Sequence, residues 1–342
     1  MAKQYVRIAM LNISMNKILI IGPAWIGDMV MAQSLFKLLK ERQPGVSLQV
    51  AAPVWTLPLL SRMKEISSVI HLPFAHGELN LKLRYKIAKQ LRDQAFTQAI
   101  VLPNSFKSAL IPWWAHIPVR TGWSRELRGL LLNDMRVLDK KRYPRMVERF
   151  LALGLSKKEA LPPQYPYPEL TISPHAKKPK NPVLALCPGA EFGSSKQWPA
   201  EYYAEIAQAK LADGWQVWLM GSAKDQTITA RIMALTQDQC IDWAGKTKLD
   251  EAIDLLSVVN AVVTNDSGLM HIAAALKKPI VALYGSTSPD FTPPLSLSAT
   301  MMKLNLTCQP CFKRECPLQH HRCMRDLTPS SVLKALNESI NY

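Results

Sequence analysis

The order of hydrophobic and polar positions predicts an alternation of buried strands and amphipathic helices. Residues 17–22 form an apolar run that ends in glycine, which is typical of a buried parallel strand. Residues 28–42 follow with apolar side chains at helical spacing, and further strands are predicted at 47–52 and 99–102. Strands that alternate with helices in this way favour a parallel sheet covered by helices.

A proline-rich stretch at residues 161–182 interrupts the pattern and is typical of a linker. The pattern then restarts, with strands predicted at 183–187, 216–220, 261–264 and 279–284 and helices at 200–212 and 271–276. We therefore predict an α/β protein with two doubly wound, Rossmann-like domains that face a central cleft. Its predicted parts are residues 15–165, a linker at 166–182, and residues 183–342, while residues 1–14 are interpreted as a disordered extension or an upstream start.

Ligands of such sheets bind at the carboxyl ends of the strands, so the loops that follow strands are the candidate sites. The first of these loops, G-P-A-W-I-G-D, contains Gly22 and Gly27, which permit a tight turn, and ends at Asp28. Asp28 is either a helix N-cap or a carboxylate that points into the cleft. The loop is neither G-x-G-x-x-G nor a Walker A loop, which argues against dinucleotide oxidoreduction.

The second loop, C-P-G-A-E-F-G-S-S-K-Q-W-P, suits a diphosphate. Ser194 and Ser195 can donate hydrogen bonds, Lys196 brings positive charge, and a helix is predicted to begin near Pro199. An ordinary polar loop is the alternative interpretation.

The third loop, T-N-D-S-G-L-M-H, again joins a strand to a helix. Ser267 and Gly268 would place backbone N–H groups at a helix N-terminus, where anions bind, and Asp266 could accept hydrogen bonds from sugar hydroxyls. His271 is either a packed histidine or a catalytic one. Asp225, in G-S-A-K-D after a predicted strand, is either a ribose ligand or part of a turn.

The chain carries a formal charge of +16 with a pI near 9.6. Between residues 81 and 150 there are 15 Lys plus Arg and 5 Asp plus Glu, a net charge of +10. Such a concentration favours an anionic partner, although a basic surface kept for solubility is the alternative. No uncharged apolar run is long enough for a transmembrane helix, and the first residues lack the features of a signal peptide.

Six cysteines are present, and Cys187 and Cys240 lie in apolar surroundings that favour buried thiols. The other four form C-x2-C-x4-C-x6-C at Cys308, Cys311, Cys316 and Cys323, with His320 and His321 close by. This spacing is compatible with zinc or with reduced structural thiols, and the sequence leaves both open.

Together these loops resemble the ADP-heptose:lipopolysaccharide heptosyltransferases, glycosyltransferase family 9, over almost the whole chain from about residue 15. The resemblance rests on G-P-A-W-I-G-D-M-V-M-A-Q-S-L, P-G-A-E-F-G-S-S-K-Q-W-P and T-N-D-S-G-L-M-H-I-A-A-A-L, in this order. The cysteine cluster followed by H-H-R-C is similar to the type II branch of the family. The resemblance implies a GT-B fold and transfer of heptose from ADP-heptose to the first heptose of the lipopolysaccharide inner core.

The resemblance also implies roles for single residues. Asp28 matches the family's general base and Lys196 its donor-phosphate lysine. The matching donor-binding positions are Ser194, Ser195, Asp225, Asp266, Ser267, Gly268 and His271. No cofactor or metal is expected to be required, although Mg²⁺ could stimulate. The implied partners are ADP-heptose, the lipid A–core acceptor and, peripherally, the anionic inner membrane at its cytoplasmic face.

Three alternatives remain at this point. One is another heptose or nucleotide-sugar specificity on the same fold. A second is a basic nucleic-acid-binding protein, for which the chain offers no aromatic-interleaved recognition motif, so we expect no nucleic-acid partner. A third is a glycosidase, which has no diphosphate to hold and so does not account for the phosphate-type loops.

Overall fold

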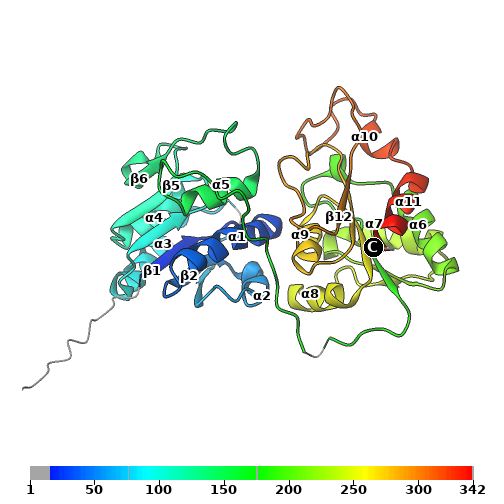
Figure 1. Ribbon diagram of the computed structural model, residues 1–342, viewed down its shortest axis with the longest axis horizontal. Coiled ribbons are helices and arrows are strands. Elements are labelled where there is room, and N and C mark those ends of the chain that lie inside the picture. The colour runs from blue at the N-terminus through cyan, green and yellow to red at the C-terminus, as the bar shows by residue number, and fades with distance from the viewer. Residues whose placement is uncertain (1–15, 76, 175, 341–342) are drawn as a thin grey trace, which may run out of the picture.

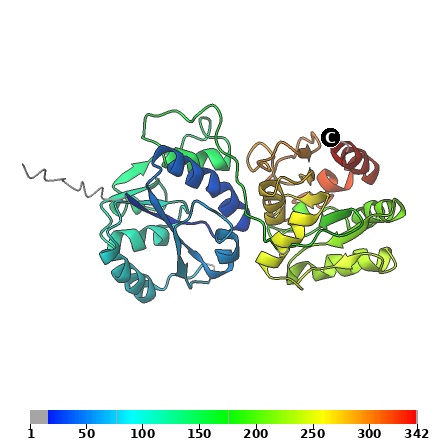
Figure 2. The ribbon, with the colours of Figure 1, turned by 60° about the horizontal axis from the view of Figure 1, so that its bottom comes forward.

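The computed structural model describes residues 16–75, 77–174 and 176–340, so the extension predicted at residues 1–14 lies outside the described residues. The chain forms two α/β halves that lie side by side, each with helices on both faces of a sheet (Figures 1 and 2). Each sheet has six strands, and every strand pair is parallel. The predicted fold class, two Rossmann-like units of GT-B type, is confirmed.

The first half comprises the described residues from 16 to the end of α5 at Leu153. Its sheet has the order β3-β2-β1-β4-β5-β6, with β1 at Lys17–Ile21, β2 at Ser47–Pro53, β3 at Ser68–Leu72, β4 at Gln98–Val101, β5 at Val119–Trp123 and β6 at Asp134–Arg136. Its helices are α1 (Ile26–Arg42), α2 (Leu57–Leu60), α3 (Leu81–Leu91), α4 (Phe106–Trp114) and α5 (Met146–Leu153).

The second half repeats this plan. Its sheet has the order β12-β11-β10-β7-β8-β9, with β7 at Val183–Cys187, β8 at Gln216–Leu219, β9 at Ile241–Asp242, β10 at Ala261–Asn265, β11 at Ile280–Leu283 and β12 at Ala299–Met302. Its helices are α6 (Ala200–Ala212), α7 (Gln226–Leu235), α8 (Leu249–Val258), α9 (Gly268–Ala275), α10 (Arg322–Arg325) and α11 (Pro329–Ile340).

In both sheets the strand order reverses at one point, between β1 and β4 and between β7 and β10. A crevice opens at such a switch point, outside the carboxyl ends of the strands, and ligands bind there. In the second half the loops at this point are the second and third candidate loops of the sequence. In the first half one of them is the glycine-containing loop before Asp28.

The strands and helices that the apolar pattern predicts are all present, with small shifts at their ends. Strands β1 and β7 are buried almost throughout, as continuous apolar runs in parallel sheets should be. One expectation changes: α1 begins at Ile26 with Trp25 as its N-cap, so Asp28 lies inside the first turn. The N-cap interpretation of Asp28 is therefore wrong.

The two halves meet through glycines at the starts of α1 and α9. A Cβ atom on Gly27 would lie 2.6 Å from Cδ2 of His271, and one on Gly268 would lie 3.1 Å from Cβ of Ile26. A Cβ on Gly27 would overlap the His271 ring and one on Gly268 would press on Ile26, so glycine at both positions lets the two helix ends pack closely. An ion pair of 2.8 Å between Arg62 and Asp254 joins the halves elsewhere.

The connector between α5 and β7, which includes the proline-rich stretch, contains no helix or strand among its described residues. It runs from one half to the other in Figure 1, and the N–H of Leu170 donates to the carbonyl of Ala275 in α9. Within the part of the chain that the structure describes, no helix combines the length and the apolar character needed to cross a membrane.

Trp198 should be a main determinant of stability in the second half. Its side chain is fully buried, its indole N–H donates to the carbonyl of Leu327 at 2.8 Å, and its ring meets Tyr203 edge-on. Trp198→Ala should lower the free energy of unfolding by about 3–5 kcal/mol, measured by equilibrium urea denaturation. Trp55→Ala, at a side chain that is 45% exposed, should cost less than about 1 kcal/mol, and equal losses would contradict this assignment.

Candidate functional site

A buried ion pair joins the two candidate loops of the second half. Lys196 lies in the short 3₁₀ turn Ser194–Lys196, and its Nζ lies 2.6 Å from Oδ2 of Asp266, which directly follows β10. The side chains of Lys196 and Asp266 are only 12% and 4% exposed. The Lys196 ammonium also donates to the Asp266 carbonyl at 3.3 Å and lies over the ring of Phe192. The structure thus brings together the cation and the carboxylate that the sequence places far apart.

Two residues complete this connection and were not predicted as site residues. The hydroxyl of Thr287 donates to Oδ2 of Asp266 at 2.6 Å. Asn265 donates to the carbonyl of Pro188 at 2.7 Å and accepts from the hydroxyl of Tyr203, which fixes the start of the phosphate-type loop. Thr287 follows strand β11 in the tripeptide G-S-T, so its place after a strand was the signal that could have identified it.

Asp28 lies in the first turn of α1, and its side chain is partly buried. Burial raises the pKa of Asp28 to about 6, while the positive charge of Lys196 opposes this rise and the negative charge of Asp266 adds to it. The three groups therefore interact electrostatically across the two halves. At neutral pH Asp28 is mostly ionised, and with this pKa it is a stronger proton acceptor than an ordinary aspartate.

His271 lies in α9, one turn after Gly268, and is buried against Gly27. Burial lowers the pKa of His271 to about 4, although Asp266 acts in the opposite direction. The imidazole is therefore neutral at physiological pH, which suits packing and hydrogen bonding and does not suit proton donation. Its contact with a donor stays a prediction.

The two serines before Lys196 face different surroundings. Ser194 is exposed. Ser195 is buried, and its hydroxyl lies 2.8 Å from that of Ser286 and donates to the carbonyl of Lys313. This geometry assigns Ser195 to the packing of the loop and leaves Ser194 as the serine able to reach a ligand.

The remaining predicted positions support turns and helix ends. Asp225 accepts hydrogen bonds from the N–H and the hydroxyl of Ser222, both at 2.8 Å, as part of a capping box. Its carboxylate fills the space beside Gly189, where a Cβ would lie 2.5 Å away. Ser267 is the N-cap of α9, and Gly22 leaves room for the side chain of Met29. Ligand contacts of these residues stay predictions.

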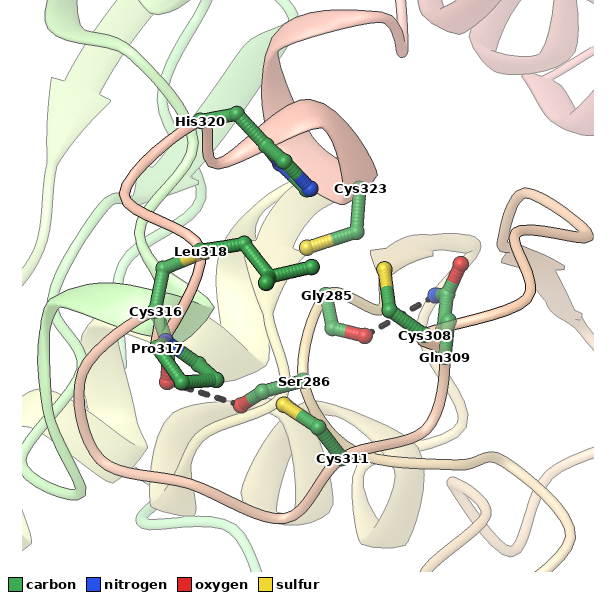
Figure 3. A pocket seen from close by; sticks show the side chains of 11 residues that line it. Gly285, Ser286, Cys308, Gln309, Cys311, Cys316, Pro317, Leu318, His320 and Cys323 are labelled. Atoms are coloured by element: carbon green, nitrogen blue, oxygen red, sulfur yellow. Dashed lines mark hydrogen bonds between the residues drawn. The ribbon is translucent and has the colours of Figure 1, made fainter.

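Cys308, Cys311 and Cys316 lie on one loop that packs against the phosphate-type loop, and Cys323 lies in α10 directly after it. In Figure 3 the side chains of Cys308, Cys311 and Cys323 surround a small pocket whose lining also includes Cys316 and His320. The carbonyl of Arg314 accepts the N–H of Ser195, and the N–H of Phe312 donates to Ser286. The cysteine loop therefore holds the segment that carries Lys196.

All six cysteines are free thiols, and Cys187 and Cys240 are buried as predicted. Across the described ranges, no group of three or more His, Cys, Asp or Glu side chains is arranged to hold a metal ion. The loop contacts above give the cysteine segment a structural role, whichever form its thiols take.

Comparison with known proteins places these loops in a family context. A family model described as glycosyltransferase family 9 (heptosyltransferase) matches residues 84–322. The chain is 46% identical to lipopolysaccharide heptosyltransferase 2 of Escherichia coli K12, over 94% of this chain and 97% of that protein. It is 44% identical to lipooligosaccharide heptosyltransferase 2 of Haemophilus influenzae, over 94% of this chain and 98% of that protein.

Solved structures agree with these sequence matches. The structure of E. coli ADP-heptose LPS heptosyltransferase II matches with a TM-score of 0.86 at 44% identity, over 95% of this chain and 98% of that one. E. coli heptosyltransferase WaaC with ADP-2-deoxy-2-fluoro heptose matches with a TM-score of 0.69 at 19% identity, over 94% of this chain and 99% of that one. The second match supports the fold alone.

The raised pKa of Asp28 predicts that this carboxylate destabilises the folded chain. Its pKa rises from 3.8 to about 6 on folding, so between these pH values the folded state binds more protons and stability falls as pH rises. Asp28→Asn should therefore exceed the native chain in free energy of unfolding at pH 8 by up to roughly 3 kcal/mol. The difference should almost vanish at pH 4.

Urea denaturation at both pH values measures this effect. Asp93→Asn, at an exposed carboxylate of the same half, is the matched control. It should give no comparable gain in the free energy of unfolding at pH 8. A destabilised Asp28→Asn chain at pH 8 would show that the environment of Asp28 favours its charge.

Proposed function

Because this chain belongs to glycosyltransferase family 9, the heptosyltransferases, we propose that it transfers L-glycero-D-manno-heptose from ADP-heptose to the first heptose of the lipopolysaccharide inner core. The relatives that match over nearly their whole length are named for this class of reaction. The observation that carries the proposal is the electrostatic interaction of Asp28 in one half with the Lys196–Asp266 pair in the other, where the starts of α1 and α9 pack together.

The donor is proposed to bind at the switch point of the second sheet. Its diphosphate would lie against Lys196, the hydroxyl of Ser194 and the N–H of Gly268 at the start of α9. Asp266, which directly follows β10, is suited to accept hydrogen bonds from heptose hydroxyls, with His271 nearby. These groups are fixed before the ligand arrives, because Thr287, Asn265 and the cysteine loop hold the segments that carry them.

The reaction is proposed to be a single displacement with inversion. The acceptor hydroxyl attacks the anomeric carbon as the bond from that carbon to the β-phosphate oxygen breaks, and ADP leaves with the electron pair. Asp28 takes the proton of the attacking hydroxyl, and its pKa of about 6 makes this transfer more favourable than it would be for an ordinary aspartate. Lys196 stabilises the negative charge that grows on the departing diphosphate.

Fixed cationic and N–H donors offset the charge of the leaving group, so we propose that no metal or other cofactor is required. Magnesium could still stimulate by neutralising part of the diphosphate. A closed cleft would exclude water and limit hydrolysis of the donor.

The acceptor is proposed to be lipid A–core, reached at the cytoplasmic face of the inner membrane. The basic segment at residues 81–150, with its net charge of +10, lies in the half opposite the donor site. This charge suits a phosphorylated acceptor and an anionic membrane surface. Nucleic acid is not proposed as a partner.

Replacing Asp28 and Lys196 one at a time should separate their two proposed roles, proton acceptor and diphosphate-binding cation. Asp28→Ala should abolish transfer, and Lys196→Ala should lower kcat by about 10²–10³, the usual cost of losing one stabilising donor of the transition state. The native kcat/KM should fall about tenfold per pH unit below about pH 6, where Asp28 becomes protonated. Mass spectrometry of an acceptor carrying one heptose measures the added heptose.

Asp28→Asn, which keeps the shape of the side chain, controls for packing, and urea denaturation verifies that each variant is folded. A folded Asp28→Asn chain with near-native activity would exclude the base role. No gain of heptose by the native protein would reject the proposed substrates.

The two serines should differ when they are replaced one at a time. Ser194→Ala should weaken ADP binding about three- to tenfold, the usual effect of one hydrogen bond, and leave stability unchanged. Ser195→Ala should lower the free energy of unfolding by about 1–2 kcal/mol, because the carbonyl of Lys313 and the hydroxyl of Ser286 lose a buried partner. Calorimetric titration with ADP and urea denaturation of both variants decide this. A larger loss of ADP affinity for Ser195→Ala, with stability intact, would return Ser195 to the donor site.

A further inference from the structure

The loop between β5 and β6 holds two leucines almost completely in solvent. Leu127 is 93% exposed and Leu130 is 89% exposed, and they lie three residues apart. A single exposed leucine is common on protein surfaces, whereas two leucines that are almost fully exposed on one short loop make that loop a candidate interaction surface.

This loop is held firmly in place. Arg128, between the two leucines, is fully buried and donates to the carbonyls of Trp123 and Pro103, both at 2.6 Å. The Glu126 carboxylate accepts the N–H of Phe106 at the start of α4 at 2.7 Å. The buried guanidinium therefore fixes a loop whose leucines point away from the fold, so their exposure is built into the structure.

Exposed basic side chains occur on this loop, at Arg125, and on the segment after β6, at Lys140, Lys141 and Arg142. The segment after β6 lies beside the loop, since the N–H of Ser124 donates to the carbonyl of Arg136 at 2.6 Å. Val137 is 84% exposed. Residues 124–145 contain seven Lys plus Arg and three Asp plus Glu. We use the name β5–β6 rim for the exposed residues Arg125, Leu127, Leu130, Val137, Lys140, Lys141 and Arg142.

The rim lies at the same sheet edge as the base. Strands β1, β5 and β6 belong to one parallel sheet, so their carboxyl ends meet at one edge. Asp28 follows β1, and the two rim segments follow β5 and β6. A surface bound at the rim is therefore bound at the cleft edge of the first half.

We propose that the β5–β6 rim docks on the surface of an anionic lipid bilayer, with Leu127 and Leu130 inserted below the headgroups. Apolar side chains that enter the acyl boundary and basic side chains that meet acidic headgroups are together the pattern of peripheral membrane binding. This inference rests on the proposed function and extends it, because a lipid-linked acceptor lies in such a surface. Docking at the rim turns the edge that carries Asp28 toward that acceptor.

Vesicle co-sedimentation of the full chain tests the proposal. Vesicles of phosphatidylethanolamine with phosphatidylglycerol should bind the native protein, and vesicles of phosphatidylcholine alone should bind it much less. Leu127→Ser with Leu130→Ser should weaken binding about tenfold, because two inserted side chains are lost. Leu297→Ser is the matched control, since Leu297 is 96% exposed but lies in the second half, and it should bind as the native chain does.

A charge pair provides a second, independent comparison. Lys140→Glu with Lys141→Glu should weaken binding and reduce its dependence on salt. Lys177→Glu with Lys178→Glu makes the same change at two exposed lysines of the connector and should have little effect. Equal losses in both pairs would show that net charge alone drives binding and would overturn the assignment to the rim.

Other outcomes also decide the question. Native binding that the leucine variant retains in full would overturn the proposal. Light scattering that shows a native dimer, dissociated in the leucine variant, would overturn it in favour of a second copy of the chain. With a deacylated, water-soluble acceptor the leucine variant should keep near-native activity. If the native chain transfers heptose to this acceptor but does not bind vesicles, only the proposal of membrane docking is rejected. Absence of transfer would instead reject the proposed function.

Discussion

The buried ion pair between Lys196 and Asp266 is the contact on which the geometry of the second half's site depends. It joins the loop after β7 to the loop after β10 across the switch point, and both partners are almost removed from water. Burying two charges is costly unless each keeps hydrogen-bond partners. The hydroxyl of Thr287 and the carbonyl of Asp266 provide them. A ligand diphosphate that binds the Lys196 ammonium must therefore compete with the Asp266 carboxylate. This competition favours ligands that carry more than one negative charge.

A second constraint keeps this pair close to the first half. Gly27 and Gly268 allow the N-terminal turns of α1 and α9 to touch, and the neutral imidazole of His271 fills the space between them. A side chain at Gly27 would overlap the ring of His271 and one at Gly268 would press on Ile26, so either would disturb the packing of α1, which carries Asp28. Gly27, predicted to permit a tight turn, and Gly268, predicted to present an N–H group to an anion, thus have a further role, since they set the spacing between the proposed base and the proposed donor site.

The sequence predicted the well-buried strands β1, β2, β4, β7, β8, β10 and β11, because buried parallel strands are apolar runs that need no tertiary information to recognise. It missed β3, β5, β6, β9 and β12, which are more exposed and so lack a continuous apolar run. It also located Asp28, Lys196 and Asp266, because the carboxyl ends of strands in such sheets meet by topology. It could not separate Ser194 from Ser195, since the partner of Ser195 is the carbonyl of Lys313, more than a hundred residues away. Thr287 and Asn265 were missed for the same reason: their importance lies in contacts between loops. The exposure of Leu127 and Leu130 depends on the buried Arg128, whose acceptors are backbone carbonyls that no sequence pattern displays.

The charges around Asp28 also indicate how donor binding would affect the base. In the free protein Lys196 lowers the pKa of Asp28 while burial and Asp266 raise it, and burial is the largest of these effects. A bound diphosphate would neutralise the positive charge of Lys196 and add negative charge on the same side of the cleft. Both changes raise the pKa of Asp28 further. The proton affinity of Asp28, the proposed base, would therefore increase when the donor is bound. The acceptor hydroxyl would then be activated best in the complex that already contains the donor. One pair of opposite charges thus holds the two loops together and, in the proposed reaction, would couple donor binding to the protonation of Asp28 in the other half.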